Sequence, residues 1–274
     1  MPHLWLILAL LFYGLATLAA SATLSGRLIA PLRWLAPMFG AGTFFHLVSL
    51  VESTVQNGKL VPADLVQSES SLAFLLAIVF FSIYAIWRTE WPGVLVAPPV
   101  FLLTLASAMG AHAPASADFS GTPEGLIYVH IALIFTGYAA LILSFLCSIL
   151  YLFQEHNLKS KHLTGFSTRM PALATLDEIS ERALQAGFPF MTFGLAAGVA
   201  VAMAMHGPMS IFEPTILLSI LLWILYLFLL FMRWKAGIRG RNAALLASFA
   251  TVLAGFSWVA HYLSTFNPGG GVQP

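Results

Sequence analysis

Long apolar stretches alternate with short polar ones along the whole chain. Eight of the apolar stretches are long enough to be membrane-spanning helices, and they cover residues 4–24, 34–51, 71–87, 94–112, 126–153, 188–206, 215–232 and 243–266. An α-helix rises 1.5 Å per residue, so about 20 apolar residues cross a hydrocarbon core of roughly 30 Å. The pattern predicts an all-α polytopic membrane protein, with eight transmembrane helices in a single integral membrane domain that covers residues 1–274.

The basic residues orient these helices in the membrane. Every Lys and Arg except Lys59 lies in or beside alternate loops, from Arg27 and Arg33 after the first stretch to Arg239 and Arg241 before the last. Cytoplasmic loops carry an excess of Lys and Arg, so this set of loops is expected to be cytoplasmic. Both termini are then outside, and we expect a multi-pass protein of the bacterial cytoplasmic (inner) membrane with periplasmic termini.

The longest loop of this cytoplasmic set contains a short amphipathic pattern. Residues 175–178, Thr-Leu-Asp-Glu, read as a capping box, and Leu176, Ile179 and Ala183 then share one face of a helix. The Gly-Phe-Pro sequence at 187–189 is a stop signal. The pattern predicts a separate helix over residues 176–186 that lies along the cytoplasmic interface, either as a tether between two spans or as a docking site for a partner.

Composition excludes several classes of protein. Charged residues make up 8% of the chain and apolar residues 59%, and the mean hydropathy is +0.88, which is too apolar for a water-soluble protein of this length. The single cysteine, Cys147, excludes a disulfide framework, a CxxC dithiol site and a CxxCH haem-attachment site. The sequence contains no HExxH or GxSxG motif, so nothing in it supports metal-dependent or serine hydrolysis.

The fifth apolar stretch carries one titratable imidazole. Residues 126–153 contain no Asp, Glu, Lys or Arg, and His130 lies about one turn from the outer end. An imidazole left unpaired in hydrocarbon costs several kcal/mol, so His130 is expected to have a partner. Two interpretations are open: His130 is a metal ligand, or it packs between helices and is bonded to a neighbouring Ser or carbonyl group.

Three histidines on separate spans fall at one depth. Counting from the predicted ends of their helices, His46, His130 and His261 lie roughly 6–9 Å below the outer boundary. Two imidazoles from different helices of a bundle can hold a haem iron from both sides. A porphyrin also needs small residues where it passes a helix and aromatic residues at its edge, and the same segments supply Gly42, Phe45, Gly137, Tyr138 and Trp258.

His206, at the end of the sixth stretch, is a further candidate. Zinc or copper sites usually have Cys, Met or carboxylate residues close to His in the sequence, and Met203 and Met205 beside His206 form the only such cluster in this sequence. Haem therefore explains the histidine pattern better than another metal does.

Four stretches of the chain resemble the cytochrome c assembly family of haem-handling membrane proteins, which includes CcsA, CcmC and HemX, and in particular its short eight-helix HemX/YpjD-like branch. They are Tyr128-Val-His130 followed by residues 137–141; residues 176–189 with Thr192, Gly194 and Gly198; residues 237–244; and residues 68–72 with Phe74.

This resemblance implies that His130 matches the first of two outer histidines that hold haem beneath a tryptophan-rich platform. The platform motif WGxxWxWD should fall at residues 206–214, which read HGPMSIFEP, so only Gly207, Glu213 and Pro214 match it. The second outer histidine has no exact counterpart, and His261 or His206 is the nearest substitute. Tyr84 and either Met232 or Arg233 stand near the transmembrane histidine pair of the larger synthetases.

The loss of the tryptophans argues against direct haem-attaching synthetase activity. We expect an accessory or regulatory protein that binds a non-covalent haem b through His130 and either His46 or His261. Arg239 and Arg241 would anchor the cytoplasmic edge. The expected partners are membrane lipid and other membrane proteins of cytochrome c assembly or haem supply, and no nucleic acid. The alternative is a polytopic carrier, or a partner-binding membrane subunit without a cofactor, whose outer histidines sense protons.

Overall fold

All regular structure in the computed structural model is helical. The model describes residues 2–24, 32–57, 65–110, 124–160, 170–206, 214–235 and 237–266. Its helices are α1 Pro2–Leu24, α2 Leu32–Asn57, α3 Leu65–Trp87, α4 Trp91–Met109, α5 Glu124–Lys159, α6 Leu173–His206, α7 Pro214–Trp234 and α8 Arg241–Phe266. The predicted all-α class is confirmed.

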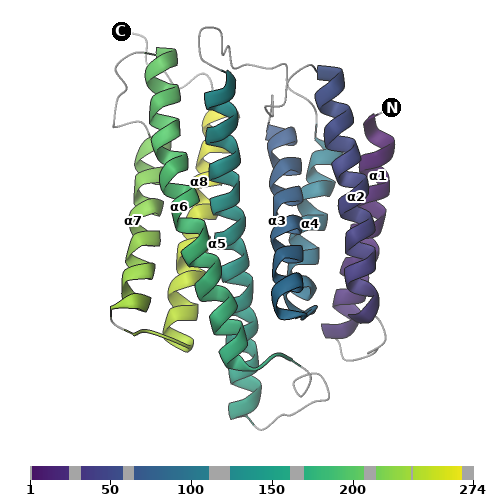
Figure 1. Cartoon of the computed structure of the whole chain (residues 1–274), viewed down its shortest axis with the longest axis vertical. Helices are drawn as coiled ribbons and strands as arrows, with labels where there is room; N and C mark the ends of the chain where they lie inside the picture. Colours follow the sequence, from purple (N-terminus) through teal and green to yellow (C-terminus); the bar gives the residue numbers. More distant parts are fainter. Residues whose placement is uncertain are drawn as a thin grey trace.

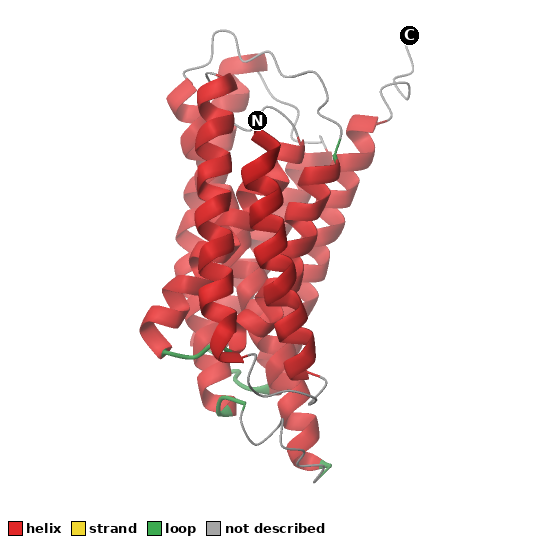
Figure 2. Ribbon diagram, turned by 90° about the vertical axis from the view of Figure 1, so that its right-hand side faces the viewer, coloured by secondary structure: helices red, strands yellow, loops and turns green. Residues whose placement is uncertain are grey.

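Seven helices in the described ranges are long and apolar enough to cross a membrane, namely α1 to α7. In α8 the described part that is scored as apolar, Arg241–Leu253, is shorter. The molecule is therefore a multi-pass membrane protein, while the eighth span stays a prediction. α1 begins and α8 ends at the same end of the bundle (Figures 1 and 2), which suits an even number of crossings. Which side of the membrane that end faces also stays a prediction.

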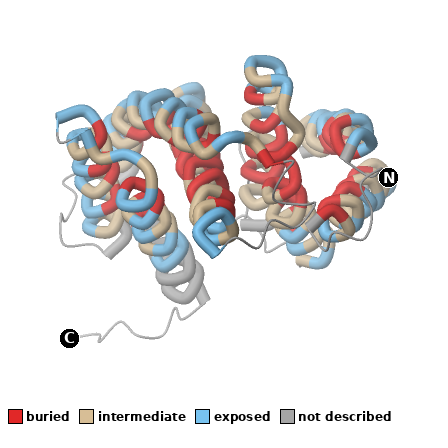
Figure 3. Tube along the Cα trace, turned by 90° about the horizontal axis from the view of Figure 1, so that it is seen from below, coloured by how far each residue is buried: buried red, intermediate tan, exposed pale blue. Residues whose placement is uncertain are grey.

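The helices form two groups, which we call the first half, α1 to α4, and the second half, α5 to α8. Each half packs mainly within itself, and the contact between α3 and α5 provides most of the joint between them. Seen along the helices in Figure 3, buried positions face neighbouring helices and exposed positions face outward. The outward positions include many large apolar side chains, among them Leu18, Phe193 and Phe249. A bilayer would cover such a surface.

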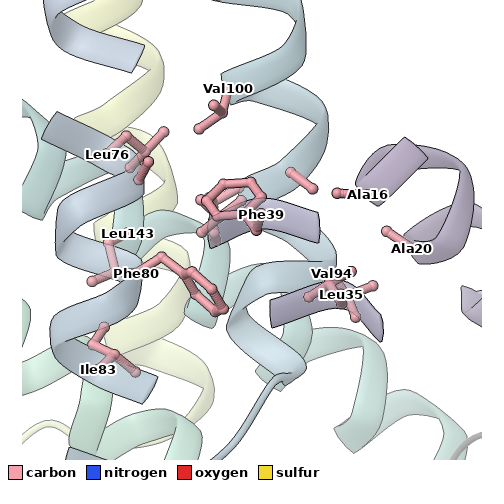
Figure 4. Packing of buried hydrophobic residues seen from close by; sticks show 14 of the residues in the cluster. Ala16, Ala20, Leu35, Phe39, Leu76, Phe80, Ile83, Val94, Val100 and Leu143 are labelled. Atoms are coloured by element: carbon pink, nitrogen blue, oxygen red, sulfur yellow. The ribbon is translucent and has the colours of Figure 1, made fainter. Parts of the chain in front are cut away.

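Aromatic, branched aliphatic and small side chains fill the interior of the first half, and Leu143 of α5 packs against them (Figure 4). Phe39 meets Phe80 edge to face, with 5.1 Å between the ring centres. Close approach at this point requires Gly93, because a Cβ atom there would lie 2.6 Å from both Leu35 Cδ2 and Phe80 Cε2. Aromatic pairs in this geometry add roughly 0.5–1.5 kcal/mol beyond the area that they bury.

The separate interfacial helix expected over residues 176–186 does not exist as such. Those residues are the first part of α6, which continues through Pro189 to His206. Leu176 and Ile179, expected on one face of that interfacial helix, are fully buried in the cluster that contains Leu150 of α5. Burial against α5 along the helix therefore outweighs the local stop signal, as tertiary contacts often do.

The α5–α6 pair projects beyond the other helices at the end away from the chain termini (Figure 1). α5 has 36 residues and α6 has 34, so they are roughly 50 Å long, against a hydrocarbon core of roughly 30 Å. The projecting ends belong to the side with the basic loops. The pair is antiparallel, and it brings His130 opposite Gly194 and Gly198 near one end and Ser144 opposite Ser180 near the other.

Candidate functional site

His130 lies on α5 with its ring against α6. Its Nδ1 atom is 2.8 Å from the backbone carbonyl oxygen of Gly194. A carbonyl oxygen only accepts hydrogen bonds, so Nδ1 must carry the proton and donate it. In the neutral imidazole the other nitrogen, Nε2, then has a free lone pair. Of the two interpretations of His130, the structure thus shows the bond to a neighbouring carbonyl, while a role as a metal ligand stays a prediction.

Two glycines of α6 make room for this ring. A Cβ atom on Gly198 would lie 2.6 Å from His130 Cε1 and 2.9 Å from Nδ1, closer than real Cβ atoms come. A Cβ atom on Gly194 would lie 2.8 Å from Ile134 Cδ1, one turn further along α5. The Gly-x-x-x-Gly spacing therefore lets α5 and α6 approach closely and fixes the position of the imidazole between them.

His261 lies on α8, which packs against α5 in the same half. The Thr251 hydroxyl of α8 donates to the Leu141 carbonyl oxygen of α5 at 3.5 Å, so these two residues lie at the same level. His130 precedes Leu141 by about 11 residues and His261 follows Thr251 by about 10, in antiparallel helices. At 1.5 Å per residue, the backbone positions of the two histidines agree in level to about 2 Å. The side chain of His261 lies outside the described ones.

His46 lies in the first half, and both of its ring nitrogens have protein partners. Nε2 is 2.8 Å from the Ser70 hydroxyl of α3, and Nδ1 is 3.4 Å from the Tyr13 hydroxyl of α1. Tyr13 also donates to Thr43 at 3.3 Å. The ring is fully buried in this network. Binding a metal through His46 Nε2 would require the Ser70 bond to break.

The residues expected to line a haem pocket fall into both halves. Tyr13 occupies the space beside Gly42, since a Cβ atom there would lie 2.8 Å from its ring. Gly137 faces Met191 of α6, and a Cβ atom on Gly137 would lie 3.3 Å from Met191 Cβ. Both glycines thus serve close helix packing, and their role beside a haem stays a prediction.

Of the aromatic residues expected in that pocket, two are described. Phe45 stacks on Trp5 and Phe12 of α1, with ring centres 6.0 and 5.6 Å apart. Tyr138 packs against two hydrophobic clusters, one that contains Phe39 and Leu143 and one that contains Leu184 and Tyr226. The side chain of Trp258 is outside the described ones.

The degenerate platform lies almost wholly outside the described residues. Residues 207–213, which include Gly207 and Glu213, are not described, and neither is the side chain of His206. Pro214 is the first residue of α7. The platform role of Gly207, Glu213 and Pro214 therefore stays a prediction.

Sequence reasoning missed a buried ion pair at the opposite end of the second half. Arg233 of α7 has a side chain only 2% exposed, and its Nη1 lies 3.1 Å from Asp177 Oδ1 and 3.9 Å from Glu181 Oε2. Nη2 donates to the Ser180 hydroxyl at 3.2 Å, and Ser180 meets Ser144 of α5 at 2.8 Å. One guanidinium therefore ties α7 to α6 and, through the serines, to α5.

This ion pair gives a structural role to part of the 176–189 stretch. Asp177 and Glu181 are one turn apart on one face of α6, which is the signal that could have predicted a shared cation. The resemblance placed either Met232 or Arg233 near a transmembrane histidine position, and this match stays a prediction. In the structure Arg233 forms an ion pair, and Tyr84 packs against Phe80 with 6.3 Å between ring centres.

The donor set around His130 suits a haem iron. A histidine that ligates a metal usually donates its other ring N–H to a carbonyl or carboxylate group, which fixes the tautomer and the ring orientation. His130 has such a bond, and α8 brings a second histidine to its level. A haem needs only two axial ligands, so this pair of positions is sufficient in number.

Comparisons with known proteins agree with this architecture. The family model described as cytochrome C assembly protein matches residues 3–268. Protein HemX of Bacillus subtilis is 33% identical over 131 residues, which is 47% of this chain and 48% of that protein. The cytochrome c biogenesis protein CcsA of Heterosigma akashiwo is 26% identical over 236 residues, covering 73% of this chain and 71% of that protein.

An uncharacterized 28.8 kDa protein of Azospirillum brasilense is 28% identical over 177 residues, 64% of this chain and 65% of that protein. The matches thus span less than two thirds of this relative and about half of the Bacillus protein. No solved structure matches. Since the family model covers nearly the whole chain, the protein belongs to the cytochrome c assembly family.

Proposed function

We propose that this protein binds a non-covalent b-type haem in the half of the bilayer away from its basic loops, with His130 Nε2 as one axial ligand and His261 as the other. The observation that carries the proposal is the Nδ1–H bond from His130 to the Gly194 carbonyl, because in the neutral ring this tautomer has its lone pair on Nε2. When bound, the haem supplies an iron centre that can be oxidised and reduced. The protein contributes the ligands, their orientation and a dry surrounding.

The depth of the site follows from the helix that holds it. Gly194 lies about 12 residues from Arg182 along α6, or roughly 18 Å. Arg182 is level with the end of α3, because its guanidinium lies 5.3 Å from the ring centre of Trp87. In a hydrocarbon core of roughly 30 Å, His130 is then nearer the boundary remote from the basic loops. This supports a haem that is reached from the periplasmic side of a bacterial inner membrane.

His261 is the better second ligand because it shares a level with His130 in the same half. His46 belongs to the other half, and both of its ring nitrogens are engaged by Ser70 and Tyr13. His206 remains an outer alternative at the end of α6.

The biological role that fits this site is accessory or regulatory. The relatives are named HemX and cytochrome c biogenesis protein CcsA, which supports a role in haem handling. Residues 206–214 lack the tryptophans that the synthetase platform contains. We infer that the protein holds or passes on haem, together with other membrane proteins of cytochrome c assembly or haem supply, and does not itself form thioether bonds.

The test is the absorption spectrum of the protein purified in detergent. We expect a Soret band that shifts on reduction, with the spectrum of a six-coordinate bis-histidine haem. The His261→Ala variant should lose the six-coordinate signature and bind haem more weakly by at least the roughly 10–100-fold typical of losing a supporting contact. The His46→Ala variant should keep the six-coordinate spectrum and the haem affinity of the unmodified protein. A protein that stays colourless when expressed with ample haem would instead favour the carrier without a cofactor.

The Gly198→Ala variant tests the orientation of His130 without removing it. The added methyl group would lie 2.6 Å from the ring, so the imidazole must move away from the Gly194 carbonyl. We expect haem affinity to fall roughly 10–100-fold, as for loss of other contacts that orient a ligand. Gly40→Ala is the matched control, because its Cβ atom would meet Phe81 at an ordinary 3.5 Å. Equal haem titrations for the two variants would contradict the orienting role.

A further inference from the structure

A hollow lies on the joint between the two halves, on the side of the basic loops. Its volume is about 280 Å³, and α3, α5 and α6 line it. We call it the seam groove and define it by Ile83, Trp87, Ala140, Ala183, Gly187 and Phe190. Its residues on α3 extend from Val79 to Trp87, so it runs roughly 12 Å along the helix.

Small residues create the seam groove, and the packing behind them disfavours larger side chains at Gly187. Ala140 of α5 and Ala183 and Gly187 of α6 form its wall. Behind that wall, Tyr226 of α7 packs directly against Gly187. A Cβ atom on Gly187 would collide with the Tyr226 hydroxyl oxygen and would lie 2.6 Å from Ala140 Cβ. The hollow is therefore built into the packing of the second half.

The lining of the seam groove is almost wholly apolar. Its two hydroxyl groups belong to Ser82 and Thr136, and both donate to carbonyl groups of their own helices, at 3.0 and 2.7 Å. All other lining side chains except Arg182 are apolar, apart from the indole nitrogen of Trp87. An occupant that fits this interior is a hydrocarbon chain.

A cationic side chain, Arg182, lies at the end of the seam groove next to the basic loops. Arg182 lies over the Trp87 ring, at the level where α3 ends, and its side chain is 59% exposed. Its Nη2 bonds Glu178 at 2.7 Å. A guanidinium has five N–H groups, so donors remain for an oxyanion. An apolar slot with a cation at its interfacial end matches the shape and charge of an anionic lipid.

We propose that the seam groove holds an anionic phospholipid of the leaflet next to the basic loops, with an acyl chain against Ala140 and Ala183 and the phosphate on Arg182. The proposal goes beyond haem binding and does not depend on it. The lipid would fill the space between α3 and α6, and so would hold the first half against the second. Anionic lipids are concentrated in the cytoplasmic leaflet and are attracted by basic residues near the surface.

Fluorescence quenching tests this assignment. Phosphatidylglycerol and phosphatidylcholine with brominated acyl chains are titrated into the protein in detergent, and the contribution of Trp87 is isolated by subtracting the signal of Trp87→Phe. We expect phosphatidylglycerol to quench Trp87 at an about fivefold lower mole fraction, which corresponds to the ~1 kcal/mol of one arginine near an anionic surface. Arg182→Gln should remove this preference.

Lys159→Gln is the matched control, because Lys159 forms the same kind of exposed pair one turn along a helix, with Glu155 at 2.6 Å, outside the groove. It should keep the preference. Equal quenching by both lipids, or a preference that survives Arg182→Gln, would overturn the proposal.

A second measurement covers the case in which Arg182→Gln fails to fold. Native mass spectrometry of Ala183→Trp, whose indole fills the groove, should show one phosphatidylglycerol fewer retained than in the unmodified protein. Unchanged lipid retention would count against the proposal. Loss of the Soret band in Ala183→Trp, with lipid retention unchanged, would show a porphyrin in the groove and would also overturn it.

Discussion

Replacing Asp177 by alanine is expected to lower the free energy of unfolding by about 3–5 kcal/mol, because it leaves Arg233 buried without its nearest carboxylate. The guanidinium is 2% exposed, and its next acid, Glu181, is 3.9 Å away. Unfolding by a denaturing detergent, followed by circular dichroism, measures the change. Lys159→Ala, which breaks an exposed pair, should cost no more than about 0.5 kcal/mol.

Replacing Arg233 by methionine should cost less than replacing Asp177. The side chains of Asp177 and Glu181 are 15% and 22% exposed, so water can reach them once the cation has gone. The double variant Asp177→Ala/Arg233→Met should therefore be more stable than Asp177→Ala alone, and the cycle of variants gives the coupling free energy. If Asp177→Ala and Lys159→Ala were equally stable, the ion pair would not hold α7 to α6.

Replacing His130 by alanine is expected to abolish haem binding, the largest functional effect of any single substitution in this protein. The variant removes an imidazole whose orientation the structure fixes, through the 2.8 Å bond to the Gly194 carbonyl. Haem content after purification, measured from the pyridine haemochrome spectrum, should fall to background.

Free imidazole should restore part of the Soret band to His130→Ala, because it can enter the space left beside Gly198. A histidine with a purely structural role would show no such rescue. His156→Ala, at an exposed position in the projecting end of α5, is the control and should keep full haem content. Full haem content in His130→Ala would refute the proposed ligand.

Hydrophobic patterning predicted the helices well, because burial in lipid demands long apolar segments with internal hydrogen bonds. The stretch predicted at 94–112 appears as α4, Trp91–Met109, and the one at 126–153 as α5, Glu124–Lys159. α5 is longer than predicted at its C-terminal end, where polar residues continue the helix. Lys159 and Glu155 pair on such an extension.

The continuity of α6 could not be predicted from local signals. Gly187 and Pro189 usually end a helix, since proline lacks an N–H group and disfavours a helical conformation in the residue before it. Here Pro189 is exposed, and Gly187 allows Tyr226 to pack closely. Only the contact of α6 with α5 and α7 decides the outcome, and such contacts leave no short-range pattern.

The candidate site was predictable in part. His130 stood out because no other side chain in residues 126–153 titrates near neutral pH, and helix spacing placed three histidines at one depth. Which pair belongs together depends on how helices are grouped, and spacing along the chain does not encode that. The bonds of His46 to Ser70 and of Arg233 to Asp177 join residues 24 and 56 positions apart, respectively.

The division into two halves has a consequence for biosynthesis. The proposed ligands both belong to the second half, and His261 is added about 130 residues after His130. A ribosome makes roughly 5–20 residues per second, so the nascent chain carries His130 for some ten seconds before its counterpart exists. The first half can insert and pack during that time, whereas cofactor capture has to wait until translation is almost complete. Chains truncated before α8 should therefore enter the membrane as colourless, protease-sensitive products.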